Sequence, residues 1–186
     1  MITIVSGLPR SGTSMMMKML QAGGIKILVD NVREADEDNL NGYFEFEKVK
    51  QLDEDTAWLN TAEGKAVKVI SYLLRNLPPR HEYKVIFMQR NIKEILASQR
   101  RMLAHRKMEN NEVPDTVMAA VFERHLEDIY EWLGSQPNIK VHYVSYNEIM
   151  RDPEPYVEEI NDFLGTDLDI EKMVNVVDPS LYRQRV

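Results

Sequence analysis

The sequence predicts an α/β fold, a three-layer sandwich in which helices flank a central parallel sheet. Short β-branched and apolar runs, typical of buried strands, alternate along the chain with amphipathic segments typical of helices. The first strand leads directly into a loop bounded by two glycines and then into a helix. No repeat, low-complexity segment or linker interrupts the 186 residues, so we expect a single domain over residues 1–186.

The first two elements have clear boundaries. A β-branched run at residues 2–5 ends at Gly7, as expected of a buried parallel strand. A helix is predicted over Thr13–Ala22, and the glycine pair 23–24 gives its C-cap signal.

Three further strands are expected in the middle of the chain. The apolar run Ile25–Asp30 predicts the second strand, and a helical pattern later extends through Trp58. The alternating run Lys65–Ser71 predicts the third strand. A short helix over Ser71–Leu77 should end at the proline pair that follows it. Tyr83–Met88 predicts the fourth strand.

The second half of the chain is predicted to be mainly helical. Long helices are expected over Ile92–Lys107 and from Pro114 onward, before and after a polar connection. The apolar side chains expected to face inward from the second helix are Val117, Val121, Leu126, Ile129 and Leu133. The remaining elements are a strand and two short helices, predicted over Ile139–Val144, Pro155–Leu164 and Ile170–Val177.

The glycine-bounded loop has the P-loop arrangement of strand, loop and helix, which suggests a P-loop NTPase-like fold. Successive backbone N–H groups and the positive end of the helix dipole favour a phosphate or a similar oxyanion there. The ATP-binding pattern G-x-x-x-x-G-K-[ST] is not met, because Thr13 follows Gly12 where the lysine would stand. Arg10 restores a cation two residues before Gly12. The alternative is a glycine turn with no ligand.

A second anion site is suggested by Arg90 and Ser98. Arg90 follows a predicted strand at the edge where open α/β sheets bind ligands. Asn91 can cap the next helix, and Ser98, seven residues later, falls on the same helical face. The alternatives are a surface arginine and an ordinary helical serine.

Composition excludes several classes of protein. Cysteine is absent, which removes disulfides and thiolate metal sites. The net charge of −7 argues against a nucleic-acid-binding protein. The sequence shows neither a signal peptide nor an apolar run long enough for a membrane span, so we expect a cytoplasmic protein without a membrane partner.

Three motifs, in family order, resemble those of sulfotransferases. G-L-P-R-S-G-T-S resembles the 5′-phosphosulfate loop, most closely that of the tyrosylprotein and broad bacterial sulfotransferases. R-N-I-K-E-I-L-A-S resembles their 3′-phosphate motif, with Ile92 in place of the usual proline. V-S-Y-N-E-I-M-R-D-P, with F-L-G beyond it, resembles a third and mainly structural stretch. There Asn147 stands where glutamate is usual.

The resemblance implies 3′-phosphoadenosine 5′-phosphosulfate (PAPS) as the sulfuryl donor, a hydroxyl or amine acceptor on a small molecule or peptide, and no metal. It assigns Arg10 to the stabilisation of the transition state and Arg90 with Ser98 to the 3′-phosphate. The residues expected to bind the donor are Gly7, Pro9, Arg10, Ser11, Gly12, Thr13, Ser14, Arg90 and Ser98. Arg183 and Arg185 could close over the donor or belong to a frayed tail.

The acceptor needs a general base. The tyrosylprotein enzymes use a glutamate, and Glu45 in G-Y-F-E is the candidate, with Glu47 or Asp30 behind it. The alternative for Glu45 is a carboxylate that stabilises a helix N-terminus. The four histidines match no catalytic position; they are His81, His105, His125 and His142.

Two other functions remain open at this point. A P-loop nucleotide kinase or NTPase would use Asp30 as a magnesium ligand, although the missing lysine argues against it. A non-enzymatic nucleotide-binding protein would bind the donor without modifying an acceptor. The sequence does not identify the acceptor or the oligomeric state.

Overall fold

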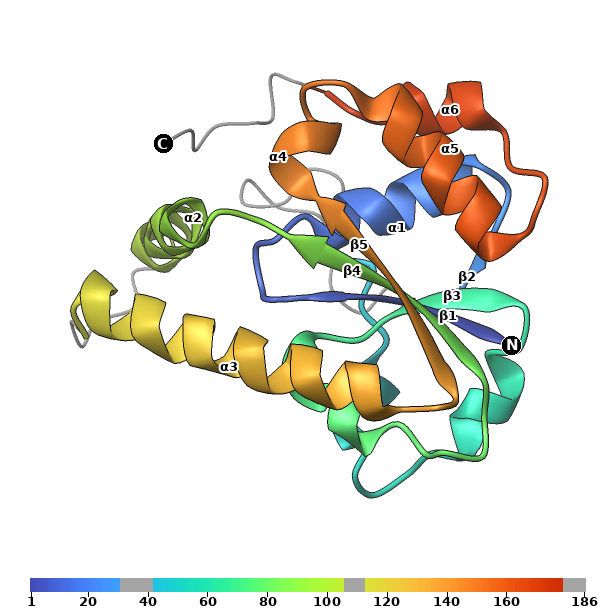
Figure 1. The fold of residues 1–186 in the computed structure, drawn as a ribbon, viewed down its shortest axis with the longest axis horizontal. Coiled ribbons are helices and arrows are strands. Elements are labelled where there is room, and N and C mark those ends of the chain that lie inside the picture. The colour runs from blue at the N-terminus through green and yellow to red at the C-terminus, as the bar shows by residue number, and fades with distance from the viewer. Residues whose placement is uncertain (31–41, 106–112, 179–186) are drawn as a thin grey trace.

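A parallel sheet forms the middle layer of the protein (Figure 1). The computed structural model describes residues 1–30, 42–105 and 113–178. Within these residues five strands pair in the order β2-β3-β1-β4-β5. Their bounds are Ile2–Gly7 for β1, Lys26–Ile27 for β2, Lys65–Lys68 for β3, Tyr83–Gln89 for β4 and Ile139–Ser145 for β5.

Strand β1 occupies the centre of the sheet. Ile4 pairs with Val67 of β3 on one side and with Val85 of β4 on the other. The side chains of β1 alternate, so Ile4 enters the core on one face and Val5 the core on the opposite face. Because all strands are parallel, the loop after β1 lies at the same edge as the carboxyl ends of β3 and β4, where α/β proteins bind ligands.

Helices cover both faces of the sheet, which confirms the predicted three-layer sandwich (Figure 1). One face carries the helices α1 (Thr13–Ala22), α5 (Pro153–Leu164) and α6 (Ile170–Val174). The other carries α3 (Asp115–Ser135). Helix α2 (Ile92–His105) follows β4 and packs on α3, and the short helix α4 (Tyr146–Ile149) follows β5.

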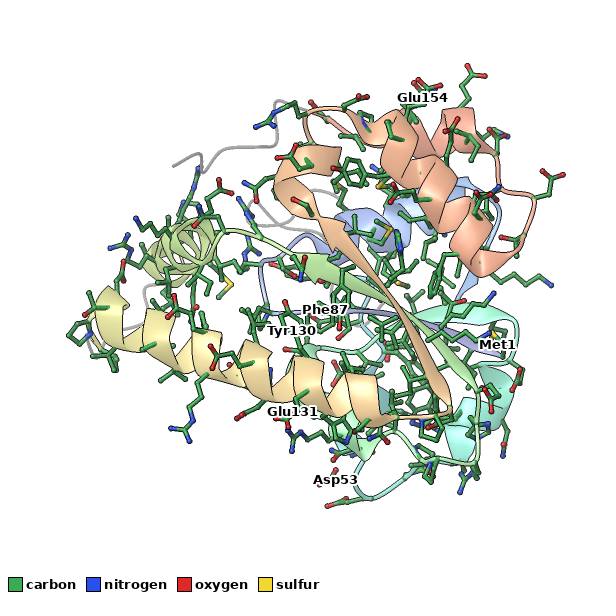
Figure 2. The ribbon with its side chains drawn as sticks, in the orientation of Figure 1. Met1, Asp53, Phe87, Tyr130, Glu131 and Glu154 are labelled. Atoms are coloured by element: carbon green, nitrogen blue, oxygen red, sulfur yellow. The ribbon has the colours of Figure 1, made fainter. Side chains whose placement is uncertain are left out.

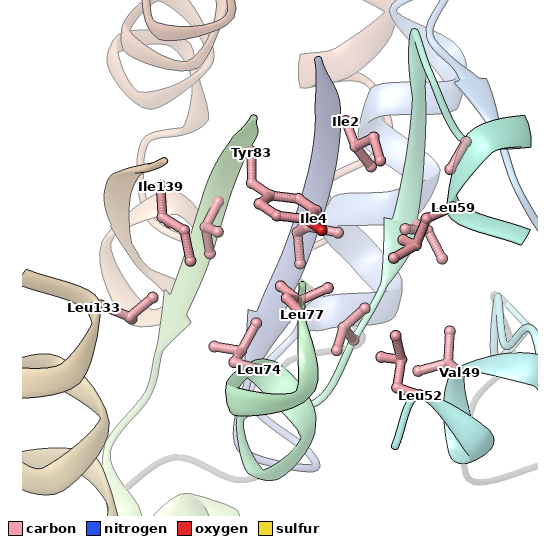
Figure 3. Packing of buried hydrophobic residues seen from close by; sticks show 14 of the residues in the cluster. Ile2, Ile4, Val49, Leu52, Leu59, Leu74, Leu77, Tyr83, Leu133 and Ile139 are labelled. Atoms are coloured by element: carbon pink, nitrogen blue, oxygen red, sulfur yellow. The ribbon is translucent and has the colours of Figure 1, made fainter. Parts of the chain in front are cut away.

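The two cores differ in composition. On the α3 face, the ring of Tyr83 lies in a cluster of mainly aliphatic side chains, with Ile4 next to it and Leu74 further away (Figure 3). Phe87 of this face meets Tyr130 of α3 edge to face, with ring centres 5.3 Å apart (Figure 2). The α1 face is rich in methionine, and its contributions from α1 are Met16, Met17, Met19 and Leu20.

Some local predictions were wrong in extent or type. Strand β2 covers only Lys26–Ile27, because the chain leaves the sheet after Leu28 and Asp30 N–H bonds to the carbonyl of Glu45. The helical pattern before Trp58 and the short helix after Ser71 are 3₁₀ turns: η1 (Glu47–Gln51), η2 (Ala57–Thr61) and η3 (Ser71–Asn76). Segments this short are often held by i→i+3 hydrogen bonds.

The inner face of α3 was also predicted incorrectly in its first half. Val117 and Val121 are 49% and 50% exposed, whereas Phe122 is buried against Leu8 and α2. The first half of α3 packs on α2 rather than on the sheet, so its buried face lies one residue further along. Ile129 and Leu133, opposite the sheet, are buried as predicted.

Helix ends differ by a few residues. Helix α5 begins at Pro153, two residues earlier than predicted, with proline in the first turn, where it is tolerated. Helix α6 ends at Val174 rather than Val177. None of the helices in the described ranges has the length and apolar character needed to cross a bilayer.

Candidate functional site

The loop between β1 and α1 is shaped by two glycines that no other residue could replace without strain. Gly7 has φ 145°, and a Cβ there would lie 2.5 Å from Ser11 Oγ and 2.6 Å from the carbonyl oxygen of Met88. Gly12 has φ 99°, and its Cβ would lie 2.4 Å from the ring of Tyr146. Both the backbone conformation and the available space therefore require glycine.

Two non-glycine residues at this edge adopt the left-handed backbone region. They are Arg10, with φ 71°, and Phe44, with φ 50°, and they are the only such residues in the described part of the chain. A positive φ costs a non-glycine residue free energy and persists where the surroundings hold it in place. Arg10 lies in the loop itself, and Phe44 precedes the candidate base Glu45.

The polar groups of the loop fit an oxyanion. Ser11 is 1% exposed, and its Oγ has no hydrogen-bond partner among the described residues. A buried hydroxyl without a partner is costly, and an anion oxygen would satisfy it. The first turn of α1 begins at Thr13, where helix N–H groups lack acceptors within the helix. The N–H of Ser11 instead bonds to the carbonyl of Leu8 at 3.2 Å, closing the turn of the loop itself.

Arg10 connects the two predicted anion sites. Its Nε donates to Ser98 Oγ at 2.9 Å, and its carbonyl oxygen accepts from a terminal nitrogen of Arg90 at 3.0 Å. The sequence assigned Arg10 to the loop and the other two residues to a separate site. The structure brings all three together, although the Arg10–Ser98 contact joins residues 88 positions apart.

The guanidinium of Arg90 is buried and held on several sides. Its Nε donates to Glu94 Oε2 at 2.9 Å, and the two side chains are 8% and 2% exposed. Its Cζ atom lies over the ring of Tyr146, 4.3 Å from the ring centre. Burial raises the pKa of Tyr146, and the positive charge of Arg90 opposes that rise. Asn147 Nδ2 donates to the second oxygen of Glu94 at 2.9 Å.

A second group of polar residues surrounds Glu45. Lys68, the last residue of β3, is 9% exposed, and its Nζ donates to the carbonyl of Tyr43. The same nitrogen lies 3.9 Å from Glu45 Oε1. Ser14 Oγ donates to the same Tyr43 carbonyl at 3.3 Å, which links this group to the start of α1. Glu45 therefore lies at the ligand-binding edge, next to a cation.

Lys68 is the functional candidate that sequence reasoning missed. Its signal was the run K-A-V-K-V-I-S, in which a lysine occupies a strand position flanked by buried apolar residues. A lysine is almost never buried unless it is paired. A lysine at a buried strand position therefore indicates polar partners nearby, which here are Glu45 and the carbonyl of Tyr43.

The reserve candidates have structural contacts elsewhere. Asp30 Oδ2 accepts the backbone N–H of Glu47, so Asp30 caps the turn η1. Glu47 pairs with Lys50 at 2.7 Å. Two histidines also have other partners, since His125 contacts Ser71 and His142 contacts Glu159.

Some predictions cannot be placed. Arg183 and Arg185 lie outside the described residues. Pro9 is exposed, and no contact with another described residue assigns it a role. No group of three or more histidine or carboxylate side chains suited to a metal ion occurs within the described ranges.

The arrangement brings three cationic side chains to one edge of an acidic protein, and two of them lie next to carboxylates. Arg10, Arg90 and Lys68 come from three different segments, and the loop N–H groups lie at the same edge. Such a site can bind an anion with two charged ends and stabilise charge that develops on it. Glu45 supplies a carboxylate that can accept a proton.

Comparison with known proteins gives one family. The model of the family described as "Sulfotransferase domain" matches residues 2–184. No curated protein matches the chain.

Two solved structures with a similar fold are sulfotransferases of low sequence identity. A sulfotransferase domain from the curacin biosynthetic pathway is 13% identical, with a TM-score of 0.57, and the match covers 95% of this chain and 77% of that domain. The mouse sulfotransferase SULT7A1, complexed with PAP, is 15% identical, with a TM-score of 0.53. That match covers 95% of this chain and 62% of the mouse protein, so this chain spans less than two thirds of its length.

Proposed function

The chain belongs to the sulfotransferase domain family, and on that premise we propose that it transfers a sulfuryl group from PAPS to a hydroxyl or amine acceptor. The acceptor is a small molecule or a peptide. The donor class is taken from the family motifs and from the mouse relative, whose structure contains PAP.

The observation that carries the proposal is the junction of the two anion sites at Arg10. The side chain of Arg10 reaches Ser98 while its carbonyl holds Arg90. A ligand that fits both sites must have phosphate groups at two ends, as a nucleoside with a 5′-phosphosulfate and a 3′-phosphate has. A nucleoside triphosphate carries its phosphates in one chain and would leave one of the sites unfilled.

In the proposed reaction the acceptor oxygen or nitrogen attacks the sulfur atom. The bond between sulfur and the bridging oxygen of the 5′-phosphate breaks, and adenosine 3′,5′-bisphosphate leaves with the negative charge. Arg10 and the N–H groups at the start of α1 stabilise that charge as it develops. The proton of the acceptor passes to Glu45.

Lys68 supports both parts of this chemistry. Its ammonium group lies 3.9 Å from Glu45 Oε1, so it restricts the position of the carboxylate that accepts the proton. Lys68 Nζ and Ser14 Oγ, at the start of α1, both donate to the carbonyl of Tyr43, so the lysine also lies close to the donor loop. A positive charge in this place stabilises the anionic sulfuryl group while it passes from the donor to the acceptor.

The kinase alternative has little support in the geometry. Its expected magnesium ligand, Asp30, accepts a backbone N–H and caps the turn η1. The lysine that reaches the β- and γ-phosphates is absent from the loop.

A thermal-shift comparison of three nucleotides tests the proposal without knowledge of the acceptor. A ligand that binds only the folded state raises the melting temperature. Adenosine 3′,5′-bisphosphate should bind about 10- to 100-fold more tightly than adenosine 5′-phosphate, because the 3′-phosphate adds a charge-assisted hydrogen bond. Stabilisation by magnesium-ATP but not by the bisphosphate would contradict the proposal and favour a kinase.

A second experiment with the same protein distinguishes an enzyme from a non-enzymatic nucleotide-binding protein. Incubation with PAPS and a panel of phenols, alcohols, amines and tyrosine peptides should release the bisphosphate at a rate that depends on one acceptor class. Tight bisphosphate binding with no acceptor-dependent release across the panel would favour the non-enzymatic alternative.

A further inference from the structure

We propose that Glu94 and Asn147 are positioning residues that fix the guanidinium of Arg90 for the 3′-phosphate of the donor. The inference rests on the proposed function, because it assumes that Arg90 binds that phosphate. It concerns two residues to which the sulfotransferase motifs give no role in this chain.

The contacts form a continuous chain of hydrogen bonds. The backbone N–H of Asn91 donates to Asn147 Oδ1 at 3.3 Å, and Asn147 Nδ2 donates to Glu94 Oε1 at 2.9 Å. Glu94 Oε2 then accepts from Arg90 Nε at 2.9 Å. The chain therefore ties α4, which carries Asn147, to the start of α2 and to the residue that follows β4.

Burial makes Glu94 depend on the donors in this chain of hydrogen bonds. Glu94 is 1% exposed, so its two oxygens depend on protein donors rather than on water. Asn147 supplies a donor to one oxygen and Arg90 to the other. The guanidinium is a rigid planar fork, so the contacts of Nε with Glu94 and of one terminal nitrogen with the carbonyl of Arg10 fix the direction of the other terminal nitrogen.

The identity of residue 147 is central to the inference. The third sulfotransferase-like motif usually has glutamate at this position, and this chain has asparagine. An aspartate, which has the shape of Asn147, would place a carboxylate oxygen where Nδ2 now lies, 2.9 Å from Glu94 Oε1, and like charges at that distance repel. The amide of Asn147 instead donates to one oxygen of Glu94, and the other oxygen accepts from Arg90.

The measurement is the ratio of the dissociation constants of adenosine 5′-phosphate and adenosine 3′,5′-bisphosphate, determined by calorimetry. This 3′-phosphate preference should fall by about 10-fold in Glu94→Gln and in Asn147→Asp, while the affinity for adenosine 5′-phosphate stays nearly unchanged. Glu148→Gln is the matched control, because it makes the same change from glutamate to glutamine next to Asn147 in α4, at a carboxylate that pairs with exposed Arg151.

The sign of the change distinguishes positioning from simple neutralisation of charge. If Glu94 only weakened the field of Arg90, removing its charge would increase the 3′-phosphate preference. If Glu94 orients Arg90, the preference falls although the site becomes more positive.

A double variant provides a rescue that a purely structural role would not produce. In Glu94→Gln/Asn147→Asp the amide and the carboxylate exchange places. The amide at position 94 can accept from Arg90 and donate to the carboxylate at position 147, which still accepts from Asn91. The 3′-phosphate preference should return toward that of the wild type.

The outcomes separate this inference from the proposed function. A wild-type protein without any 3′-phosphate preference would overturn both. A wild-type preference that Glu94→Gln preserves or increases would overturn only the positioning role. Equal loss of affinity for both nucleotides, or a double variant that recovers nothing, would also contradict it.

Discussion

Arg10 combines features that single residues seldom have together. It has a positive φ, its side chain reaches the predicted 3′-phosphate site, and its carbonyl holds Arg90. The backbone strain is maintained by these contacts and by the turn that Ser11 closes. The residue can therefore respond to groups at both ends of a bound nucleotide.

Replacing Arg10 should affect turnover more than binding. In Arg10→Ala, kcat should fall by about 10²- to 10³-fold, because the cation acts mainly on charge that develops in the transition state. The dissociation constant of the bisphosphate should rise by less than about 10-fold, because Arg90 and the loop N–H groups remain. Single-turnover kinetics and calorimetry measure the two effects.

Arg100→Ala is the matched control, because Arg100 is an exposed arginine that pairs with Asp115 at the surface. Its kcat should equal that of the wild type. Wild-type kcat in Arg10→Ala, with any accepted substrate, would remove Arg10 from the mechanism.

Glu45 is tested by a change of nearly equal volume. Glu45→Gln should lower kcat by about 10²-fold or more, because the amide cannot accept the acceptor proton, and should leave bisphosphate affinity nearly unchanged. The control is Glu47→Gln, which removes a carboxylate two residues away that pairs with Lys50. A lower melting temperature with unchanged kcat would show that Glu45 is structural.

At the level of elements, the junction of α3 with η3 depends on one histidine. His125 Nε2 lies 2.8 Å from Ser71 Oγ, and its ring stacks on Tyr72 with ring centres 3.8 Å apart. Burial lowers the pKa of His125 from its usual 6.5, Arg75 lowers it further, and Asp128 opposes the shift. The neutral ring is thus the form that the folded protein favours.

This shift predicts a loss of stability in acid. The unfolded chain takes up a proton on His125 at a higher pH than the folded protein does, so the contribution is present above about 6.5 and lost as the pH falls below it. The melting temperature should fall less in His125→Gln than in the wild type between about pH 7 and about pH 5. Differential scanning calorimetry at several pH values measures the difference.

The control for this prediction is His105→Gln, which changes an exposed histidine at the end of α2. It should follow the wild-type pH dependence. Equal slopes in the wild type and in His125→Gln would show that the pKa of His125 does not differ between the folded and unfolded states.

At the level of the whole molecule, locally encoded features were predicted well. The strand β1 and the helix α1 have the predicted bounds, because glycine and hydroxyl residues mark their ends within the segment itself. β4 and β5 each run one residue longer than predicted. The fold class follows from their alternation with helices.

What the sequence could not predict depends on distant contacts. β2 is short because Asp30 bonds to the segment around residues 45–47 rather than to the sheet. Val117 and Val121 are exposed because α2, not the sheet, covers the first half of α3. No periodicity in the sequence carries this information.

In the candidate site, too, the local motifs were predicted and the contacts between distant residues were not. The loop and the Arg90–Ser98 pair were identified from motifs, whereas Lys68 and the contact between Arg10 and Ser98 were not. Lys68 belongs to a different strand from the loop, and the Arg10–Ser98 contact spans 88 positions. Whether these residues bind the donor stays a prediction for the nucleotide experiments.

The close approach of Tyr146 to Gly12 has an evolutionary consequence. The ring atom Cδ2 lies 2.4 Å from where a Cβ on residue 12 would be, so the ring occupies the volume that any larger residue would need. The two positions cannot drift independently. Among descendants of this chain, a side chain at position 12 should be found only together with a smaller residue at position 146, and that exchange would also remove the ring beneath Arg90. Glycine in the loop therefore limits which residues can stand at position 146 in α4, 134 positions further along the sequence.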